Sequence, residues 1–191
     1  MNQEIQQEIL RQDYAMIQHN IESFLKNQVS QKKVKGVVFG LSGGIDSTVI
    51  AYLCSKVFKK NALALVMPDS AVSPSSDTGD ALKIIGEIGI DYKLIDINTI
   101  HKRYSNYLEP GELALGNLRA RIRSNIIYYY ANLKNLLVLG TSDKSEYLIG
   151  YFTKFGDGSA DMLPIVSLYK TQLREFAKTI GVPINIIAKK S

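Results

Sequence analysis

The sequence predicts an α/β protein in which a doubly wound, mostly parallel sheet is flanked by helices. Four short apolar or β-branched runs are typical of strands buried on both faces, and they lie at residues 36–42, 62–68, 91–97 and 136–142. A helical pattern separates each run from the next, and this alternation indicates parallel strands joined by helices. The carboxyl ends of such strands meet at one edge of the sheet, which is where ligands bind.

The helices are predicted from apolar residues that recur at steps of three and four. At the N-terminus these steps run from Ile5 to Leu25, so we expect one long amphipathic helix over residues 3–29. The later helices are expected at residues 46–60, 76–89, 98–108, 112–133 and 169–180. A chain of 191 residues is long enough for one well-formed core, so we expect a single domain over residues 1–191.

Composition narrows the class of ligand and the compartment. The net charge of +5 favours anionic ligands, but long Lys/Arg blocks are missing, so we expect no nucleic-acid partner. The single cysteine, Cys54, excludes an internal disulfide and lies on an apolar helix face, where a buried structural thiol is expected. No run of about 18 apolar residues and no signal-peptide pattern occurs, so the sequence predicts a soluble, cytoplasmic protein without membrane contact.

The first predicted strand leads through Ser42, Gly43 and Gly44 into a helix that starts near Asp46. Glycines let the backbone approach an anion closely, and the free N–H groups of a helix N-terminus attract it. Neither the Walker pattern nor the dinucleotide fingerprint is present. An alternative is an ordinary strand-to-helix turn in which Asp46 or Ser47 serves as the helix cap.

Charged residues also follow the later strands. In the helix at 112–133, Asn117 and Arg121 share one face, while Arg119 and Arg123 share another. An amide and a guanidinium on one face can grip a phosphate or carboxylate, although a solvated basic face is the alternative. Beyond the strand at 136–142, Glu146 is a candidate second carboxylate for a magnesium ion opposite Asp46; alternatively it closes a capping box with Asp143.

Two further segments carry candidate site residues. The segment 150–165 combines Gly150, Gly156 and Gly158 with three charged residues and aromatic anchors, which favours a mobile loop that closes over a substrate; a surface turn is the alternative. The charged residues are Lys154, Asp157 and Asp161. Lys170 opens the last helix, where a cation opposes the helix dipole, so it is a candidate anion contact or an exposed lysine.

The string SGGIDS at residues 42–47 resembles the pyrophosphate loop of the ATP pyrophosphatases. Taken together with GNLRARIR, VLGTSDKSE, the loop YFTKFGDGSAD and SLYKTQLREF, it resembles NAD synthetase from residue 34 to the end of the chain. This resemblance implies a Rossmann-like, adenine nucleotide alpha hydrolase-like fold. It also implies a ligase that amidates deamido-NAD to NAD with ATP as co-substrate, through an acyl-adenylate, releasing AMP and diphosphate.

The resemblance also implies residue roles. Asp46 and Glu146 match the Mg²⁺ ligands, Asp157 lies close to the reacting carboxylate, and Lys170 assists catalysis. Arg121, Lys154 and Asp161, with Asn117, match residues on the dinucleotide. The ATP site is matched by Gly40, Leu41, Ser42, Gly43, Gly44, Ile45, Asp46, Ser47, Thr141 and Lys170. Members of this family pair as homodimers, so the tyrosines and isoleucines of residues 125–133 are expected at the interface, where Asn117 and Arg121 are placed to serve the partner's site.

The sequence departs from the family in three places. Asp143 and Ser159 stand where many members have asparagine and glycine, and a C-terminal loop and helix of the family are expected to be absent after Ser191. Ammonia is the expected nitrogen donor, because a glutaminase domain needs a nucleophile and far more residues. The alternatives are another adenylating ATP pyrophosphatase, GMP synthetase-like or tRNA-modifying, and a nucleotide-binding regulator without turnover.

Overall fold

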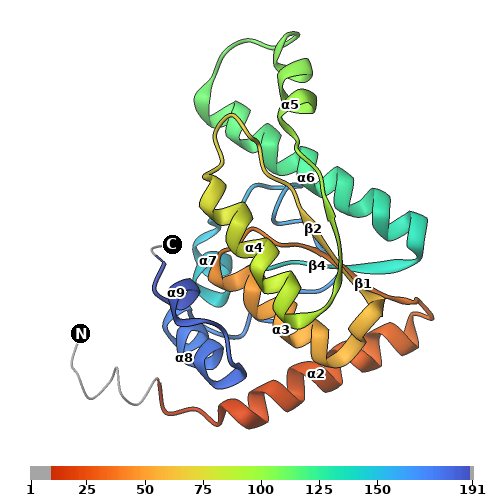
Figure 1. Ribbon diagram of the computed structural model, residues 1–191, viewed down its shortest axis with the longest axis vertical. Coiled ribbons are helices and arrows are strands. Elements are labelled where there is room, and N and C mark those ends of the chain that lie inside the picture. Colours follow the sequence, from red (N-terminus) through yellow and green to blue (C-terminus); the bar gives the residue numbers. More distant parts are fainter. Residues whose placement is uncertain (1–9, 190–191) are drawn as a thin grey trace.

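A computed structural model describes residues 10–189, and in that range four parallel strands form one sheet (Figure 1). The strands are β1 (Gly36–Gly40), β2 (Ala62–Val66), β3 (Asp91–Leu94) and β4 (Leu136–Leu139). They lie in the order β3-β2-β1-β4, so the chain moves outward from β1 to β3 and then crosses to the far side of β1. This arrangement confirms the doubly wound α/β class.

Helices cover both faces of the sheet (Figure 1). On one face lie α3 (Ile45–Phe58), α4 (Ser75–Ile88) and α8 (Lys170–Ile180), and α2 (Tyr14–Gln31) packs against α3 and α8. The opposite face is covered by α6 (Glu112–Lys134). The shorter helices are α5 (Asn98–Ser105), α7 (Lys144–Ile149), α9 (Ile184–Ile187) and the 3₁₀ turn η1 (Lys59–Asn61). No helix within residues 10–189 is long and apolar enough to span a membrane.

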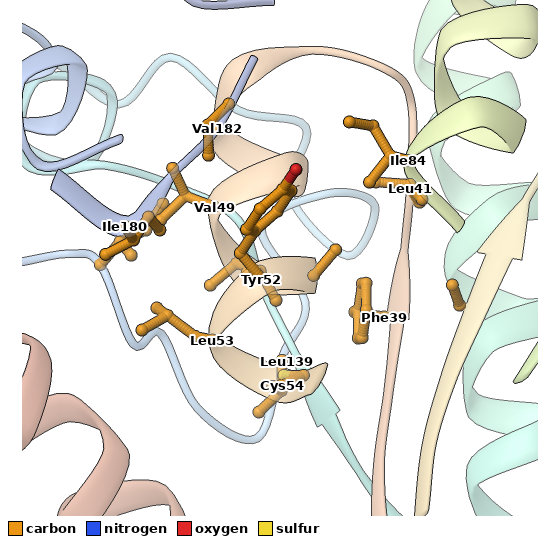
Figure 2. Packing of buried hydrophobic residues seen from close by; sticks show 14 of the residues in the cluster. Phe39, Leu41, Val49, Tyr52, Leu53, Cys54, Ile84, Leu139, Ile180 and Val182 are labelled. Atoms are coloured by element: carbon orange, nitrogen blue, oxygen red, sulfur yellow. The ribbon is translucent and has the colours of Figure 1, made fainter. Parts of the chain in front are cut away.

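Alternate residues of β1 fill two separate cores. Val37 and Phe39 belong to the cluster beneath α3 and α8, whereas Val38 belongs to the cluster beneath α6. Figure 2 shows Phe39 within the first of these clusters, with Cys54 and Leu53 on the neighbouring helix. The prediction of a buried thiol at Cys54 is confirmed, because the side chain is fully buried and burial raises its pKa.

Two expectations about these elements are wrong. Residues 3–9 of the expected 3–29 helix lie outside the described range. Residues 11–13 are not helical, because the Asp13 side chain accepts from the Met16 N–H at 2.9 Å and caps a new helix. The run at 91–97 is not buried on both faces. It forms β3 at the sheet edge, where all four strand residues are exposed, because a strand at the edge is covered incompletely.

The strand order reverses between β1 and β4. The connection through α3 leads from β1 to β2 on one side of β1, whereas β4 pairs with β1 on its other side. The loops that follow β1 and β4 therefore turn in opposite directions and leave a space between them. Such a divergence forms the ligand crevice of doubly wound sheets. The residues that follow β1 and β4, from Leu41 and from Gly140, therefore meet at the predicted site.

Candidate active site

The turn between β1 and α3 is organised around the N-terminus of α3. Gly44 is the N-cap residue, and no side chain caps the helix. Instead, the Ser47 hydroxyl accepts from the Ser42 N–H at 3.1 Å and lies 3.1 Å from the Ser42 hydroxyl. The alternative that Asp46 or Ser47 serves as the helix cap is therefore wrong, and the Asp46 carboxylate is available for other partners.

Gly43 is the position where this turn requires glycine. Its φ of +83° lies in the left-handed region, and a Cβ there would lie 2.3 Å from the carbonyl oxygen of Asp77 on α4. Backbone of α4 and backbone of the glycine turn are thus in direct contact. The side chains of Leu41 and Ile45 are buried, and Leu41 also lines the neighbouring cavity.

Three carboxylates meet beside the turn. Asp46 comes from α3, while Asp143 and Glu146 come from the start of α7, and one oxygen of each lies within 4.8 Å of the others. The capping box predicted as the alternative for Glu146 is present, because Asp143 accepts from the Glu146 N–H at 2.8 Å. The same Glu146 side chain faces Asp46, so the two expectations for Glu146 are compatible. Hard carboxylate oxygens at this spacing suit a cation such as Mg²⁺.

The ammonium group of Lys170 lies inside this carboxylate cluster. Its Nζ is 2.6 Å from Asp46 Oδ1, 3.0 Å from Glu146 Oε1 and 3.0 Å from Asp143 Oδ2. Lys170 is the first residue of α8, and its N–H donates to the Ser145 hydroxyl at 3.1 Å, so the start of α8 is fixed to α7. Lys170 is therefore not an exposed lysine, and its first partners are carboxylates.

Charge and burial shift the pKa of these groups. Burial lowers the pKa of Lys170, but hydrogen bonds and charge from Asp46, together with the neighbouring carboxylates of Glu146 and Asp143, raise it above the ordinary lysine value. The pKa of Glu146 is raised, first by burial and then by the neighbouring carboxylates, while Lys170 opposes the shift. A lysine with a raised pKa stays protonated, so Lys170 carries a permanent positive charge here.

A cavity of about 390 Å³ opens between the ends of β1, β2 and β4. Ser42, Ser47 and Thr141 line it on the side of the glycine turn, and Asp157 lines it from the 150–161 loop. Apolar residues make up much of the remaining wall, including Leu41, Leu65, Met67, Ile127 and Leu139. A largely apolar cavity with a few polar groups beside an anion-binding turn has the character of a nucleoside pocket.

Two arginines of α6 were not predicted as site residues. Arg123 lines the cavity and donates from Nε to the Met67 carbonyl at 2.8 Å, and Arg119 donates from Nε to the buried Asp69 carboxylate at 2.6 Å. Burial lowers the pKa of Arg123, and Asp69 opposes this shift. The face shared by Arg119 and Arg123 is therefore not a solvated basic face. Helical spacing could place them together, but their partners after β2 lie 50 and more residues away.

Comparison with known proteins decides the family. The model of the NAD synthase family matches residues 17–191. An NH3-dependent NAD+ synthetase from Hyperthermus butylicus is 49% identical, over 96% of this chain and 68% of that protein. This chain belongs to the NAD synthase family.

Solved structures agree with that assignment. An NH3-dependent NAD synthetase from Campylobacter jejuni superposes with a TM-score of 0.89 at 39% identity, covering 92% of this NAD synthase chain and 77% of the other. An NMN synthetase from Francisella tularensis gives the same TM-score of 0.89 at 35% identity, with 94% and 76% covered. The fold is thus shared by synthetases with different named products, and the architecture alone does not select the substrate.

The 150–161 loop of this NAD synthase packs against α6. The Thr153 hydroxyl donates to Asn117 Oδ1 at 2.8 Å, and Arg121 donates from Nε to the Lys154 carbonyl at 3.2 Å. Asn117 and Arg121 therefore brace the loop within one chain. Asp157 accepts from the Thr153 N–H at 2.9 Å, so its carboxylate stabilises the turn whose residues line the cavity.

Not every predicted residue reaches the cavity. Asp161 accepts from the Val138 N–H at 2.8 Å and thereby ties the loop to β4, and Lys154 is exposed, with Nζ 5.0 Å from the centre of the Phe155 ring. Neither residue lines the cavity that adjoins the glycine turn. If they bind a dinucleotide, as the sequence predicts, they bind a part that lies outside this NAD synthase cavity.

Lys189, near the end of the described range, was also not predicted. Its Nζ donates to the Gly43 carbonyl at 3.1 Å and lies 2.9 Å from Asp77 Oδ1 and 2.7 Å from Asp80 Oδ2. The segment after α9 is thus tied to both the glycine turn and α4. In this NAD synthase, α4 and the segment after α9 are both distant in sequence from the glycine turn and hold it in place.

Proposed function

We propose that this chain catalyses the ATP-dependent amidation of deamido-NAD to NAD, with ammonia as nitrogen donor and AMP and diphosphate as the other products. The observation that carries this proposal is that the glycine turn lines one cavity through Ser42 and Ser47 and is followed directly by Asp46, a member of the three-carboxylate cluster, in a chain of the NAD synthase family. The relative from Hyperthermus butylicus, which bears the name NH3-dependent NAD+ synthetase, supports ammonia as the donor.

In this proposal ATP lies along the edge of the sheet. The adenosine occupies the largely apolar cavity beside Thr141, and the free N–H groups at the start of α3 hold the diphosphate part. Asp46 and Glu146 hold Mg²⁺, whose chemistry when bound is to offset the charge that develops on the phosphate oxygens. The positive charge of Lys170 also offsets the charge that develops on the phosphate oxygens.

The reaction proceeds in two displacements. A carboxylate oxygen of the pyridine ring attacks the α-phosphorus of ATP, and the bond to diphosphate breaks. Ammonia then attacks the acyl carbon, loses a proton, and expels AMP. No protein nucleophile is needed, so the chain acts by positioning and electrostatic stabilisation. Asp157 lines the cavity, and we assign it the orientation of the attacking ammonia.

We further propose that the chain works as a homodimer. Tyr129 and Leu133 on α6 are 61% and 62% exposed, an apolar character suited to a subunit interface. The dinucleotide then lies beyond the cavity, near Lys154 and Asp161, with Asn117 and Arg121 behind the same loop. Because ATP is a substrate, we place the reaction in the cytoplasm.

The proposal is tested by assaying product formation from defined mixtures. Purified protein with deamido-NAD, Mg-ATP and ammonium is expected to form NAD, AMP and diphosphate in equal amounts, measured by chromatography. Nicotinate mononucleotide should be a poorer acceptor than deamido-NAD, and glutamine should not replace ammonium. Diphosphate released without NAD would contradict the proposal, and so would rapid glutamine use by this chain. ATP-dependent thermal stabilisation with no product from any acceptor would identify a nucleotide-binding regulator.

A further inference from the structure

A positive charge already occupies the place where a divalent cation is proposed to bind. The Lys170 Nζ contacts all three carboxylates of the cluster at 2.6 to 3.0 Å. We propose that the Lys170 ammonium and the divalent cation occupy this cluster alternately, so that metal loading expels the ammonium toward the nucleotide phosphates. This inference concerns the order of events at the site and rests on the metal role in the proposed function.

The dimensions of the cluster argue against simultaneous occupancy. One oxygen of each carboxylate lies within 4.8 Å of the others, which is the space of a single cation. Mg²⁺ holds its oxygen ligands at about 2.0–2.1 Å, so an ion bound to Asp46 and Glu146 takes the position of Nζ or lies in contact with it. Two cations about 3 Å apart repel strongly in a partly buried site. One of them must leave.

Charge balance favours the metal once it is available. Three carboxylates share one ammonium, which leaves an excess of negative charge within the cluster. A divalent cation compensates more of it than an ammonium does. In the absence of metal, Lys170 keeps the carboxylates from repelling one another.

Lys170 can leave without any movement of the helix. Its backbone is fixed at the start of α8 by the bond to Ser145, but the ammonium stands at the end of a chain of rotatable methylenes. The side chain is 19% exposed, so part of it faces solvent. Rotation about its side-chain torsions moves Nζ by several ångströms. The ammonium then points toward the phosphates only after the metal has bound, so the position of the ammonium depends on metal binding.

Asp143 makes this cluster more acidic than a two-carboxylate site. The residue is fully buried, and its Oδ1 is used by the Glu146 N–H. Its Oδ2 accepts no hydrogen bond, although it lies 3.0 Å from Lys170 Nζ, so that contact is one of charge without good hydrogen-bond alignment. A buried carboxylate oxygen without a hydrogen bond is costly unless a cation faces it. We infer that Asp143 is a third ligand for whichever cation occupies the cluster.

The test measures Mn²⁺ binding by electron paramagnetic resonance, using the whole chain without nucleotide. Lys170→Met removes the ammonium and keeps an unbranched side chain. It is expected to bind Mn²⁺ at least about tenfold more tightly than wild type, because no charge-assisted hydrogen bonds must be broken. Adding Asp143→Asn to Lys170→Met should reverse much of this gain. Lys178→Met, on the same helix and paired with Glu175 at 2.7 Å, is the matched control and should bind as wild type does.

A second measurement uses the unaltered protein, in case Lys170→Met folds poorly. Reductive methylation of Lys170, followed by peptide mass spectrometry, should accelerate when Mn²⁺ is saturating, while the rate at Lys178 stays constant. Equal or weaker Mn²⁺ binding by folded Lys170→Met, or no change in the methylation of Lys170, would overturn the inference. Failure to form NAD while Mn²⁺ still exposes Lys170 would overturn the proposed function and leave this inference standing.

Discussion

Replacing Asp46 with asparagine is expected to lower the rate of NAD formation by at least about a hundredfold, the usual loss when a preorganised charge contact is removed from an active site. Asp46 is the member of the carboxylate cluster that comes from the glycine turn, and it makes the 2.6 Å contact to Lys170. The amide keeps the size of the side chain but not its charge. The measurement is the initial rate with saturating ATP, deamido-NAD and ammonium. Glu146→Gln should cause a loss of the same order.

Asp91→Asn is the matched control, since Asp91 is exposed at the free edge of the sheet on β3. It should retain the wild-type rate. Thermal melting of each variant separates a loss of turnover from a loss of fold. Wild-type rates in both Asp46→Asn and Glu146→Gln would show that these carboxylates serve only the local structure of their helices.

Gly43→Ala is expected to damage both folding and nucleotide binding. The residue has a φ of +83°, and the new methyl group would meet the Asp77 carbonyl at 2.3 Å. Left-handed backbone costs about 1–2 kcal/mol for a residue with a Cβ, so the free energy of unfolding in urea should fall by at least about 1 kcal/mol. ATP binding, measured by calorimetry, should weaken at least about tenfold, because displaced amides lose hydrogen bonds to charged phosphate worth about 1.5–3 kcal/mol each.

The neighbouring glycine provides the control. Gly44 has a φ of −86°, which any residue adopts, and a Cβ there would lie 3.3 Å from the Ser42 hydroxyl, which can rotate. Gly44→Ala should therefore cost less than about 1 kcal/mol, the scale of a change at a helix N-cap. If the two variants behave alike, the geometry described for the turn is not what makes it bind ATP.

Local pattern was sufficient to predict most of the fold. The apolar runs that became β1, β2 and β4 were located because strands covered on both faces must be apolar throughout. The same reasoning failed for β3, where Tyr92 and Leu94 are 47% and 52% exposed. Periodicity cannot tell an edge strand from a central one, since the difference lies in what packs against it. Periodicity also predicted a first helix that continues through residues 11–13, whereas Asp13 caps the start of a new helix.

The site residues that directly follow strands could be predicted from the sequence. The contacts between residues far apart in the sequence could not. The glycine spacing predicts the turn, and the sequence is sufficient to predict that the carboxylates of Asp46 and Glu146 lie opposite each other. Nothing in the sequence indicated that Lys170 enters their cluster, because that contact joins residues 124 apart. Lys189 likewise meets the turn across 146 residues. Such contacts depend on how helices pack, which local pattern does not encode.

In the proposed reaction, a carboxylate oxygen of the acceptor becomes bonded to the α-phosphorus of ATP in this site. The direct measurement is mass spectrometry of the products formed from deamido-NAD labelled with ¹⁸O in its pyridine carboxylate, with Mg-ATP and ammonium. The expected products are AMP that carries one labelled oxygen, NAD that retains the other, and unlabelled diphosphate. Unlabelled AMP formed together with NAD would contradict the proposed reaction, because the oxygen would then have left by a route that does not pass through an acyl-adenylate.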